Sequence, residues 1–273
     1  MSWLSDRHYF LLGVIFYGLN TLYSVFLWRR GFRHHDRMTT GLLLVGFLFH
    51  TWAMFSRGMT LHRCPIDNFY ETVVFIIWTM VVVCLIVSLL PRFRFLGAFA
   101  TPVIFILGVF ALMPSLDAAK SDGAVNWMRS LHASLTLLSY GAFGLGAVAA
   151  SMFLTQERDL KSHKPRAVFS LLPPMERLEK SMTWLLFVGA FLLTLGLALA
   201  PPLVGQQTTK SRITNDPKVV WSIVVWVTYL FLLVRHKWFG LIGRRFAWGA
   251  ILIFVFVLLT FWGVDLISPS HRI

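Results

Sequence analysis

Eight apolar stretches alternate with short polar connections along this chain. A helix needs about 20 mostly apolar residues to cross a bilayer, and each stretch approaches that length. We therefore predict eight membrane-spanning helices, at His8–Trp28, Thr39–Ser56, Tyr70–Leu90, Phe95–Met113, Ser130–Thr155, Met182–Ala200, Val219–Val234 and Phe246–Ile267. The seventh is short enough that an extra turn at either end fits the pattern.

Composition supports a membrane protein built only from helices. The 273 residues are 57% hydrophobic and 14% charged, and the mean hydropathy is +0.69, which is too apolar for a soluble domain of this length. The longest connection, 156–181, contains Leu172-Pro173-Pro174-Met175-Glu176 and predicts a cytoplasmic elbow with a short interfacial helix. We expect an all-α polytopic bundle and one integral-membrane domain over 1–273.

The basic residues predict the orientation of the bundle. A net charge of +13 would suggest nucleic acid as the partner of a soluble protein, but here the basic residues lie between apolar runs. One set of connections carries 16 of the 25 basic residues: Arg29, Arg30, Arg33, Arg37, Arg92, Arg94, Arg158, Lys161, Lys164, Arg166, Arg177, Lys180, Arg235, Lys237, Arg244 and Arg245. The richer side should be cytoplasmic. Both termini and the loops 57–69 and 205–218 then face outward across the inner (plasma) membrane.

The first span and the cysteines indicate whether a signal peptide is cleaved and whether the chain has a thiol or zinc centre. Met1–Arg7 precedes the first apolar run, and no small-residue cleavage site follows that run, so we expect a retained span. The two cysteines, Cys64 and Cys84, are far apart and favour neither a thiol-redox centre nor a zinc site.

Small residues mark the fifth span as a packing helix. Small side chains let helix backbones approach closely in lipid, so this span should be central to the bundle. The residues concerned are Gly141, Ala142, Gly144, Gly146, Ala147, Ala149 and Ala150.

Ionisable residues within or beside the spans are the candidates for chemistry, because charge is costly in a bilayer. They are His50, Glu71, His132, Asp265 and His271. A lone intramembrane histidine often makes one interhelical hydrogen bond, and terminal Asp or His residues are usually solvated. His34, His35, His163 and His236 lie among cytoplasmic Arg and Lys, where solvated or headgroup-facing roles are expected.

Convergence of three histidines points to one ligand class. His50, His132 and His271 all fall in the predicted outer half, on helices that can be neighbours. Neutral imidazoles in an aromatic-rich apolar bundle suit the axial positions of an iron porphyrin, here haem b. Carboxylates are too few for a hard-cation or zinc hydrolase site.

A polar loop, 205–218, precedes the seventh span. Asp216 can cap the start of that helix, and Pro217 suits its first turn, where the missing N–H is not needed. The local pattern therefore predicts a capped helix start on the outer face.

Several motifs resemble the cytochrome c assembly family, which includes the membrane haem-handling subunit of the system II cytochrome c synthase and its HemX-like relatives. They follow in the same order through nearly the whole chain. They are Pro65-x-x-Asn68-x-Tyr70-Glu71, Leu131-His132, Leu138-Ser139-Tyr140-Gly141-Ala142-Phe143, Phe153-Leu154-Thr155-Gln156-Glu157-Arg158, Leu172-Pro173-Pro174-Met175-Glu176-Arg177-Leu178, Leu192-Leu193-Thr194-Leu195-Gly196, Asp216-Pro217-Lys218-Val219-Val220-Trp221-Ser222, Gly243-Arg244-Arg245 and Gly263-Val264.

The resemblance implies a bundle that carries haem to the outer face and presents it for attachment to apocytochrome c. His132 matches one outer axial ligand, His271 lies within one residue of the other, and His50 matches a ligand inside the membrane. By the same resemblance Asn68, Tyr70, Glu71, Asp216, Pro217, Lys218 and Trp221 line the haem site, and Lys218, Arg129 or Arg212 pairs with its propionates.

Two departures from the family pattern stand out. The family has several tryptophans just upstream of Asp216, whereas residues 206–215 contain none. Val234 occupies the position of the second intramembrane histidine, and His236 lies about 200° away around the helix at 3.6 residues per turn. The pair His132 and His271 is therefore the better candidate.

Two functions fit these observations. The first is a haem-binding membrane protein that assists c-type cytochrome biogenesis, alone or with a second assembly subunit. The alternative is a HemX-like membrane scaffold or regulator that keeps the fold, has lost haem transfer and acts through a protein partner. A transporter would need inverted repeats or broken helices. Thioether bonds would form between haem and the partner's cysteines, so whether the chain is an enzyme stays open. Lipid is an expected partner and nucleic acid is not.

Overall fold

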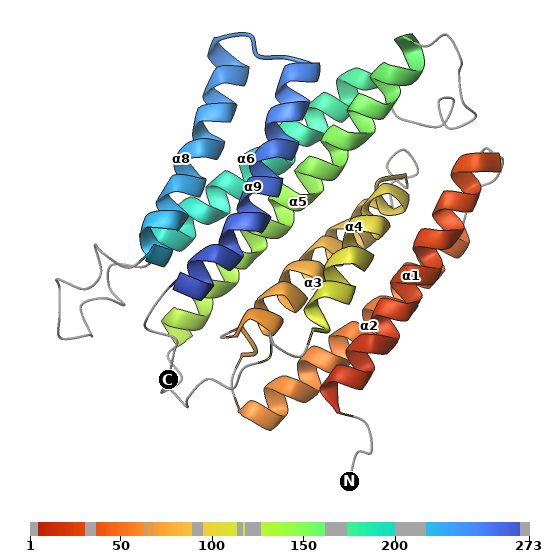
Figure 1. Ribbon diagram of the computed structural model, residues 1–273, viewed down its shortest axis with the longest axis vertical. Coiled ribbons are helices and arrows are strands. Elements are labelled where there is room, and N and C mark those ends of the chain that lie inside the picture. The colour runs from red at the N-terminus through yellow and green to blue at the C-terminus, as the bar shows by residue number, and fades with distance from the viewer. Residues whose placement is uncertain are drawn as a thin grey trace. The chain divides into compact units, whose positions relative to one another are not determined.

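The computed structural model describes residues 5–30, 37–62, 64–66, 68–88, 95–113, 117, 127–161, 174–199 and 217–267. Within these ranges it contains helices and no strands (Figure 1). The helices are α1 (Asp6–Arg30), α2 (Arg37–Leu61), α3 (Phe69–Ser88), α4 (Phe95–Ala111), α5 (Trp127–Lys161), α6 (Met175–Ala198), α8 (Pro217–Trp238) and α9 (Arg244–Ile267). Each of the eight predicted spans coincides with one helix, which confirms the all-α prediction.

Among the described helices, six are long and apolar enough to cross a membrane. They are α1, α2, α3, α5, α6 and α8, and a shorter apolar stretch, Phe99–Ala111, lies in α4. The number of spans and the side on which the termini lie stay predictions. The predicted elbow shortens, because α5 continues to Lys161 and α6 begins at Met175. The predicted interfacial helix would fall in 162–173, outside the described residues.

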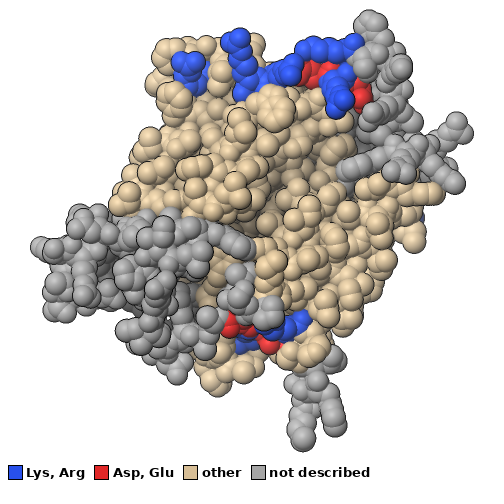
Figure 2. Space-filling view, viewed as in Figure 1, with Lys and Arg blue, Asp and Glu red and all other residues tan. Residues whose placement is uncertain are grey.

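Charged residues concentrate at the ends of these helices. In α1, for example, Asp6 and Arg7 occupy the first turn and Arg29 and Arg30 the last. On the face that Figure 2 shows, Lys, Arg, Asp and Glu lie in a few small groups, and most of the described surface carries no charge. This distribution keeps charge out of the hydrocarbon layer, as expected of a membrane protein.

The chain forms two compact units. Unit 1 comprises Met1–Ala119 with Leu154–Leu178, and unit 2 comprises Lys120–Phe153 with Glu179–Ile273. In unit 1, α1 lies along α2, and α4 packs against α1 and α3 (Figure 1). A Cβ atom on Gly46 would lie 2.6 Å from Cε1 of Tyr17, so the close approach of α1 and α2 requires glycine there.

Unit 2 is organised on α5. In the apolar part of this helix 83% of the residues are buried, the largest share among the six span-length helices of the described chain. This agrees with the burial that its small residues predict. Gly146 admits the Leu186 side chain of α6, which would lie 2.8 Å from an added Cβ. The turn between α8 and α9 uses Gly240 and Gly243 at φ of 63° and 62°, in the left-handed region that favours glycine.

Candidate functional site

His132 lies in α5 of unit 2, where its ring meets the end of α6. Its Nδ1 atom is 2.7 Å from the backbone carbonyl oxygen of Gly196. A carbonyl oxygen only accepts hydrogen bonds, so Nδ1 must carry the proton and the neutral ring keeps its lone pair on Nε2. Metal-ligating histidines commonly have this arrangement, in which the second nitrogen donates to a carbonyl or carboxylate. The geometry suits His132 to bind a metal through Nε2.

Trp221 is the described aromatic residue of the predicted haem-contacting motif. Its Nε1–H donates to Oγ1 of Thr260 in α9 over 2.9 Å, and its ring packs edge-on against Tyr140 in α5 at 5.9 Å. With 8% of its surface exposed, Trp221 joins three helices of unit 2. These contacts hold the indole between α5, α8 and α9, and its predicted contact with haem stays a prediction.

The remaining predicted residues of the outer motif are only partly described. The helix start is confirmed, because α8 begins at Pro217 as the sequence predicts. Asp216, Arg212 and His271 lie outside the described residues, as do the side chains of four residues that the helices include: Arg129, Pro217, Lys218 and Asp265. Their predicted roles stay predictions.

His50 lies in α2 of unit 1 and is fully buried. Its Nδ1 is 3.1 Å from the hydroxyl oxygen of Tyr17, and the Phe10 ring packs edge-on at 4.9 Å. The Val74 backbone lies near the ring, and Nε2 is buried without a well-aligned hydrogen-bond partner among the described residues. The role of His50 as a haem ligand stays a prediction.

The motif Pro65-x-x-Asn68-x-Tyr70-Glu71 contributes residues to a hydrogen-bond network centred on Arg57. The guanidinium of Arg57 donates from Nε to Oε1 of Glu71 over 2.8 Å and from Nη1 to Oδ2 of Asp6 over 2.8 Å. It also pairs with both carboxylate oxygens of Asp117. This network, hereafter the Arg57 cluster, joins the ends of α1, α2 and α3 to the segment after α4.

Asn68 and Glu71 form a reciprocal cap on α3 within the cluster. Oδ1 of Asn68 accepts from the backbone N–H of Glu71 over 2.8 Å, and Oε2 of Glu71 accepts from the backbone N–H of Asn68 over 3.4 Å. Nδ2 of Asn68 donates to Asp117 over 2.8 Å. This is a capping box with Asn in the cap position.

Tyr70 provides an aromatic face for the same cluster. The guanidinium carbon of Arg57 lies 4.9 Å from the centre of its ring, and that of Arg7 lies 5.3 Å away. The structure thus brings Asn68, Tyr70 and Glu71 together in contacts within unit 1. Their contact with haem stays a prediction.

Sequence reasoning did not single out Arg57, Asp6 or Asp117. Arg57 follows the predicted end of the second span directly, and a cation at that depth needs a partner. That requirement was the available signal for an ion pair. The partners themselves come from helix starts and a loop, and no spacing rule connects those segments.

His236 makes more contacts within unit 2 than the solvated or headgroup-facing role expected from the sequence requires. Its Nδ1 is 2.9 Å from the carbonyl oxygen of Leu241, and its Nε2 is 3.3 Å from Oγ1 of Thr183 in α6. The ring stacks on Phe246 of α9 at 4.0 Å. Both nitrogens therefore have partners, and the ring ties α8 to α6 and α9. The other three predicted solvated histidines, at 34, 35 and 163, lie outside the described residues.

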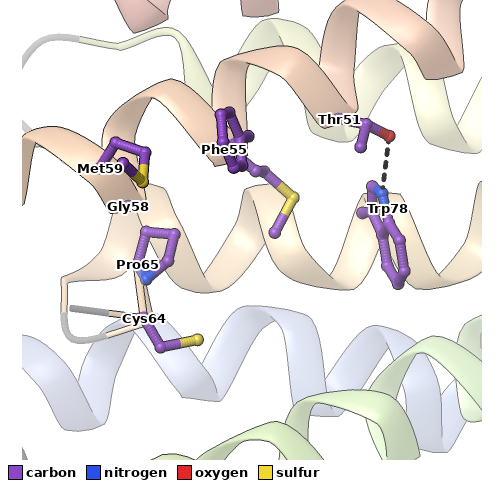
Figure 3. Close-up of a pocket in the computed structure, with 8 residues that line it drawn as sticks. Thr51, Phe55, Gly58, Met59, Cys64, Pro65 and Trp78 are labelled. Atoms are coloured by element: carbon purple, nitrogen blue, oxygen red, sulfur yellow. Dashed lines mark hydrogen bonds between the residues drawn. The ribbon is translucent and has the colours of Figure 1, made fainter. Parts of the chain in front are cut away.

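An apolar groove lies between α2 and α3, with a cavity volume of about 330 Å³. Figure 3 shows Thr51, Phe55 and Met59 of α2 and Trp78 of α3 beside Cys64 and Pro65, and the Trp78 Nε1–H donates to Thr51 over 3.0 Å. Its lining contains none of the predicted histidines. In the described chain, no group of three or more His, Cys, Asp or Glu residues could hold a metal ion.

Comparison with known proteins agrees with the motifs. Residues 66–271 match the cytochrome C assembly protein family. The chain belongs to this family. It is 25% identical to the cytochrome c biogenesis protein CcsA of Trieres chinensis, over 84% of this chain and 85% of that protein. It is 26% identical to Protein HemX of Brevibacillus brevis, over 96% of this chain and 95% of that protein. The predicted family is confirmed.

Proposed function

We propose that this chain handles haem during the assembly of c-type cytochromes and presents it on the outer face of the plasma membrane. Haem is the cargo, and apocytochrome c, alone or with a second assembly subunit, is the partner that receives it. The observation that carries the proposal is the hydrogen bond between His132 and Gly196, which leaves the lone pair of His132 on Nε2. A neutral imidazole held in this way is a good axial ligand of haem iron.

The outer haem would have His132 on one side and His271 on the other. Trp221 and Asp216 would line the site, and Lys218, Arg129 or Arg212 would pair with a haem propionate, because cations suit exposed carboxylates. His132 and His271 would hold the haem iron, and the haem would supply the vinyl groups to which the partner's thiols add. The chain itself holds the cargo in place and supplies no nucleophile to that bond.

A haem site at His50, inside the membrane, is a weaker candidate than the outer site at His132 and His271. His50 offers an unpaired Nε2, but the second intramembrane histidine of the family is Val234 here. His236, the nearest substitute in sequence, uses both ring nitrogens within unit 2. The second intramembrane histidine of the family is therefore missing, and six-coordinate binding is expected only at the outer pair.

A scaffold function is the second candidate. Residues 206–215 contain no tryptophan, so the aromatic surface that stacks on the porphyrin in the family is absent. The match to Protein HemX extends over 96% of this chain, compared with 84% for the CcsA of Trieres chinensis. In this alternative the chain keeps the fold and acts on a protein partner without carrying haem.

An absorption spectrum separates the two functions. The protein is purified in detergent from haem-replete bacterial cells, and the Soret band is compared among the wild type, His132→Ala and His271→Ala. His8→Ala is the matched control, because His8 is exposed at the start of α1. We expect a Soret band that each of the two ligand substitutions weakens and the control preserves.

The outcomes are distinct. A wild-type protein with no Soret band, and none after added haem, rejects haem handling and leaves the scaffold function. A Soret band that neither substitution changes rejects His132 and His271 as ligands. Imidazole added to His132→Ala provides a further check, because restored six-coordinate absorption would place a ligand vacancy at that residue.

A further inference from the structure

We infer that Gly196 is a positioning residue for His132: its carbonyl oxygen fixes the imidazole with Nε2 unprotonated, and its missing side chain lets α6 approach closely enough to do so. The link from this geometry to haem rests on the proposed function. The geometry itself concerns only α5 and α6 of unit 2 and is testable without haem.

The carbonyl of Gly196 is available because of its place in α6. The last carbonyl groups of a helix have no intrahelical N–H partner, and α6 ends at Ala198. The Gly196 oxygen accepts one bond from the backbone N–H of Leu199 over 3.1 Å and one from Nδ1 of His132 over 2.7 Å. The partial negative charge at a helix C-terminus strengthens the second bond and makes Nε2 a better electron donor.

Only glycine permits this approach of the two helices. A Cβ atom at 196 would lie 2.8 Å from Oγ1 of Thr136, closer than real Cβ atoms come to other heavy atoms. The Thr136 hydroxyl is not free to move away, because it donates to the backbone carbonyl of His132 over 2.9 Å. An alanine at 196 would therefore push α6 away from α5 at the point where His132 is held.

The contact is also fixed from the opposite side of α6. Trp226 of α8 donates from Nε1 to Oγ1 of Thr194 over 2.8 Å, two residues before Gly196. The end of α6 is thus held between α5 and α8. The added methyl group would meet Thr136 and the backbone of His132 in α5. A shift of α6 away from α5 therefore lengthens the bond from Gly196 to His132, and this is the bond that we expect to be lost.

Removal of the Thr136 hydroxyl should reverse the effect of a methyl group at 196. Once Oγ1 is gone, the nearest remaining atoms are the backbone N of Thr136 at 3.5 Å and the His132 carbonyl oxygen at 3.7 Å, which are ordinary contacts. The double variant Gly196→Ala with Thr136→Ala should therefore restore the wild-type packing. The double variant Gly196→Ala with Thr136→Ser keeps the hydroxyl oxygen and should not.

The test is the tautomer of His132, read by nuclear magnetic resonance of haem-free protein with 13C,15N-labelled histidine in lipid. His132→Ala identifies the signal by its loss. We expect the proton on Nδ1 in the wild type, a change away from that form in Gly196→Ala, and its return with Thr136→Ala but not with Thr136→Ser. Gly41→Ala is the matched control, since an added Cβ there has no neighbour within 4 Å.

The inference is overturned by a proton on Nε2 of wild-type His132, by an unchanged tautomer in Gly196→Ala, or by no rescue from Thr136→Ala. If Gly196→Ala does not fold, the rescued double variant still decides. For haem binding, loss of a hydrogen bond that orients a ligand histidine typically lowers metal affinity by about 10–100-fold. We expect a loss of that size in Gly196→Ala. Correct tautomers with no haem bound to any variant would uphold the inference and reject the proposed function.

Discussion

The guanidinium of Arg57, at the end of α2, donates through Nε to the carboxylate of Glu71 at the start of α3 over 2.8 Å. The side chain of Glu71 has no exposed surface, and that of Arg57 is 15% exposed. The pair connects two helices that follow each other in the chain, and Asp6 and Asp117 extend it to two further segments. The Arg57 cluster therefore joins four segments of unit 1 at one end of its helices.

Replacement of Arg57 by alanine should strongly destabilise unit 1. Removal of one partner leaves the Glu71 carboxylate buried without its counter-charge, a change that typically costs about 3–5 kcal/mol. We expect a clear drop in the thermal unfolding midpoint in detergent. Arg37→Ala is the control, since Arg37 is exposed at the other end of the same helix. Equal midpoints for the two variants would show that the Arg57 cluster contributes nothing to stability.

Asn68 should act chiefly through its cap on α3. Asn68→Ala removes the acceptor for the backbone N–H of Glu71, and the loss of a cap costs about 0.5–2 kcal/mol. Asn68→Ser keeps a capping oxygen but loses the amide that donates to Asp117. We expect the serine variant to unfold between the wild type and the alanine variant. If both variants lose haem while their stability is unchanged, Asn68 has the haem contact that the sequence predicts.

The helices were predictable because a membrane span requires a long run of apolar residues, and such a run is a local feature of the sequence. The small residues of α5 likewise predicted its burial. Contacts between distant segments were not predictable in this way. Tyr17 reaches His50 only because Gly13 and Gly46 bring α1 against α2, and no local pattern specifies that pairing.

The histidines illustrate the same limit. His132 was predicted as a ligand from its place beside a span, but the carbonyl that orients it belongs to a glycine 64 residues further along the chain. His236 was predicted to be solvated because its sequence neighbours are Arg235 and Lys237. Its ring instead packs on Phe246 across the turn, and the positive φ of Gly240 and Gly243 that shapes this turn is a property of the backbone.

Gly189 should tolerate no side chain. A Cβ atom there would lie 2.5 Å from Cε1 of Phe143. The Phe143 ring has little room to move away, because it stacks on the Tyr229 ring with 3.6 Å between the ring centres. Forcing extra atoms into such packing costs about 1–3 kcal/mol, so Gly189→Ala should lower the unfolding midpoint. Gly41→Ala meets no neighbour within 4 Å and should leave the midpoint unchanged or raise it. The reverse order would contradict the packing of α5 against α6.

The two cysteines test the predicted orientation without any new residue. Cys64 is exposed and follows α2, whereas Cys84 is buried in α3. If the loop 57–69 faces outward, a membrane-impermeant maleimide added to intact spheroplasts should label Cys64 alone. Cys64→Ser should abolish the labelling, and Cys84→Ser should not. Labelling of Cys64 only after the membrane is opened would place this loop in the cytoplasm and reverse the topology.

His236 should stabilise unit 2 without binding haem. Its Nδ1 donates to the carbonyl oxygen of Leu241 and its Nε2 contacts the hydroxyl of Thr183, so the one lone pair of the neutral ring, on Nε2, reaches iron only if the Thr183 contact breaks. His236→Gln keeps a polar group that reaches similar partners, whereas His236→Ala removes both bonds and the stacking on Phe246. We expect His236→Ala to lower the free energy of unfolding by about 1 kcal/mol for each lost hydrogen bond, and the unfolding midpoint to fall further in His236→Ala than in His236→Gln. Any Soret band of the wild-type protein should keep its position in both variants. A shifted or weakened band in His236→Gln, with stability retained, would instead make His236 a haem ligand and would require the α8–α9 turn to open when haem binds.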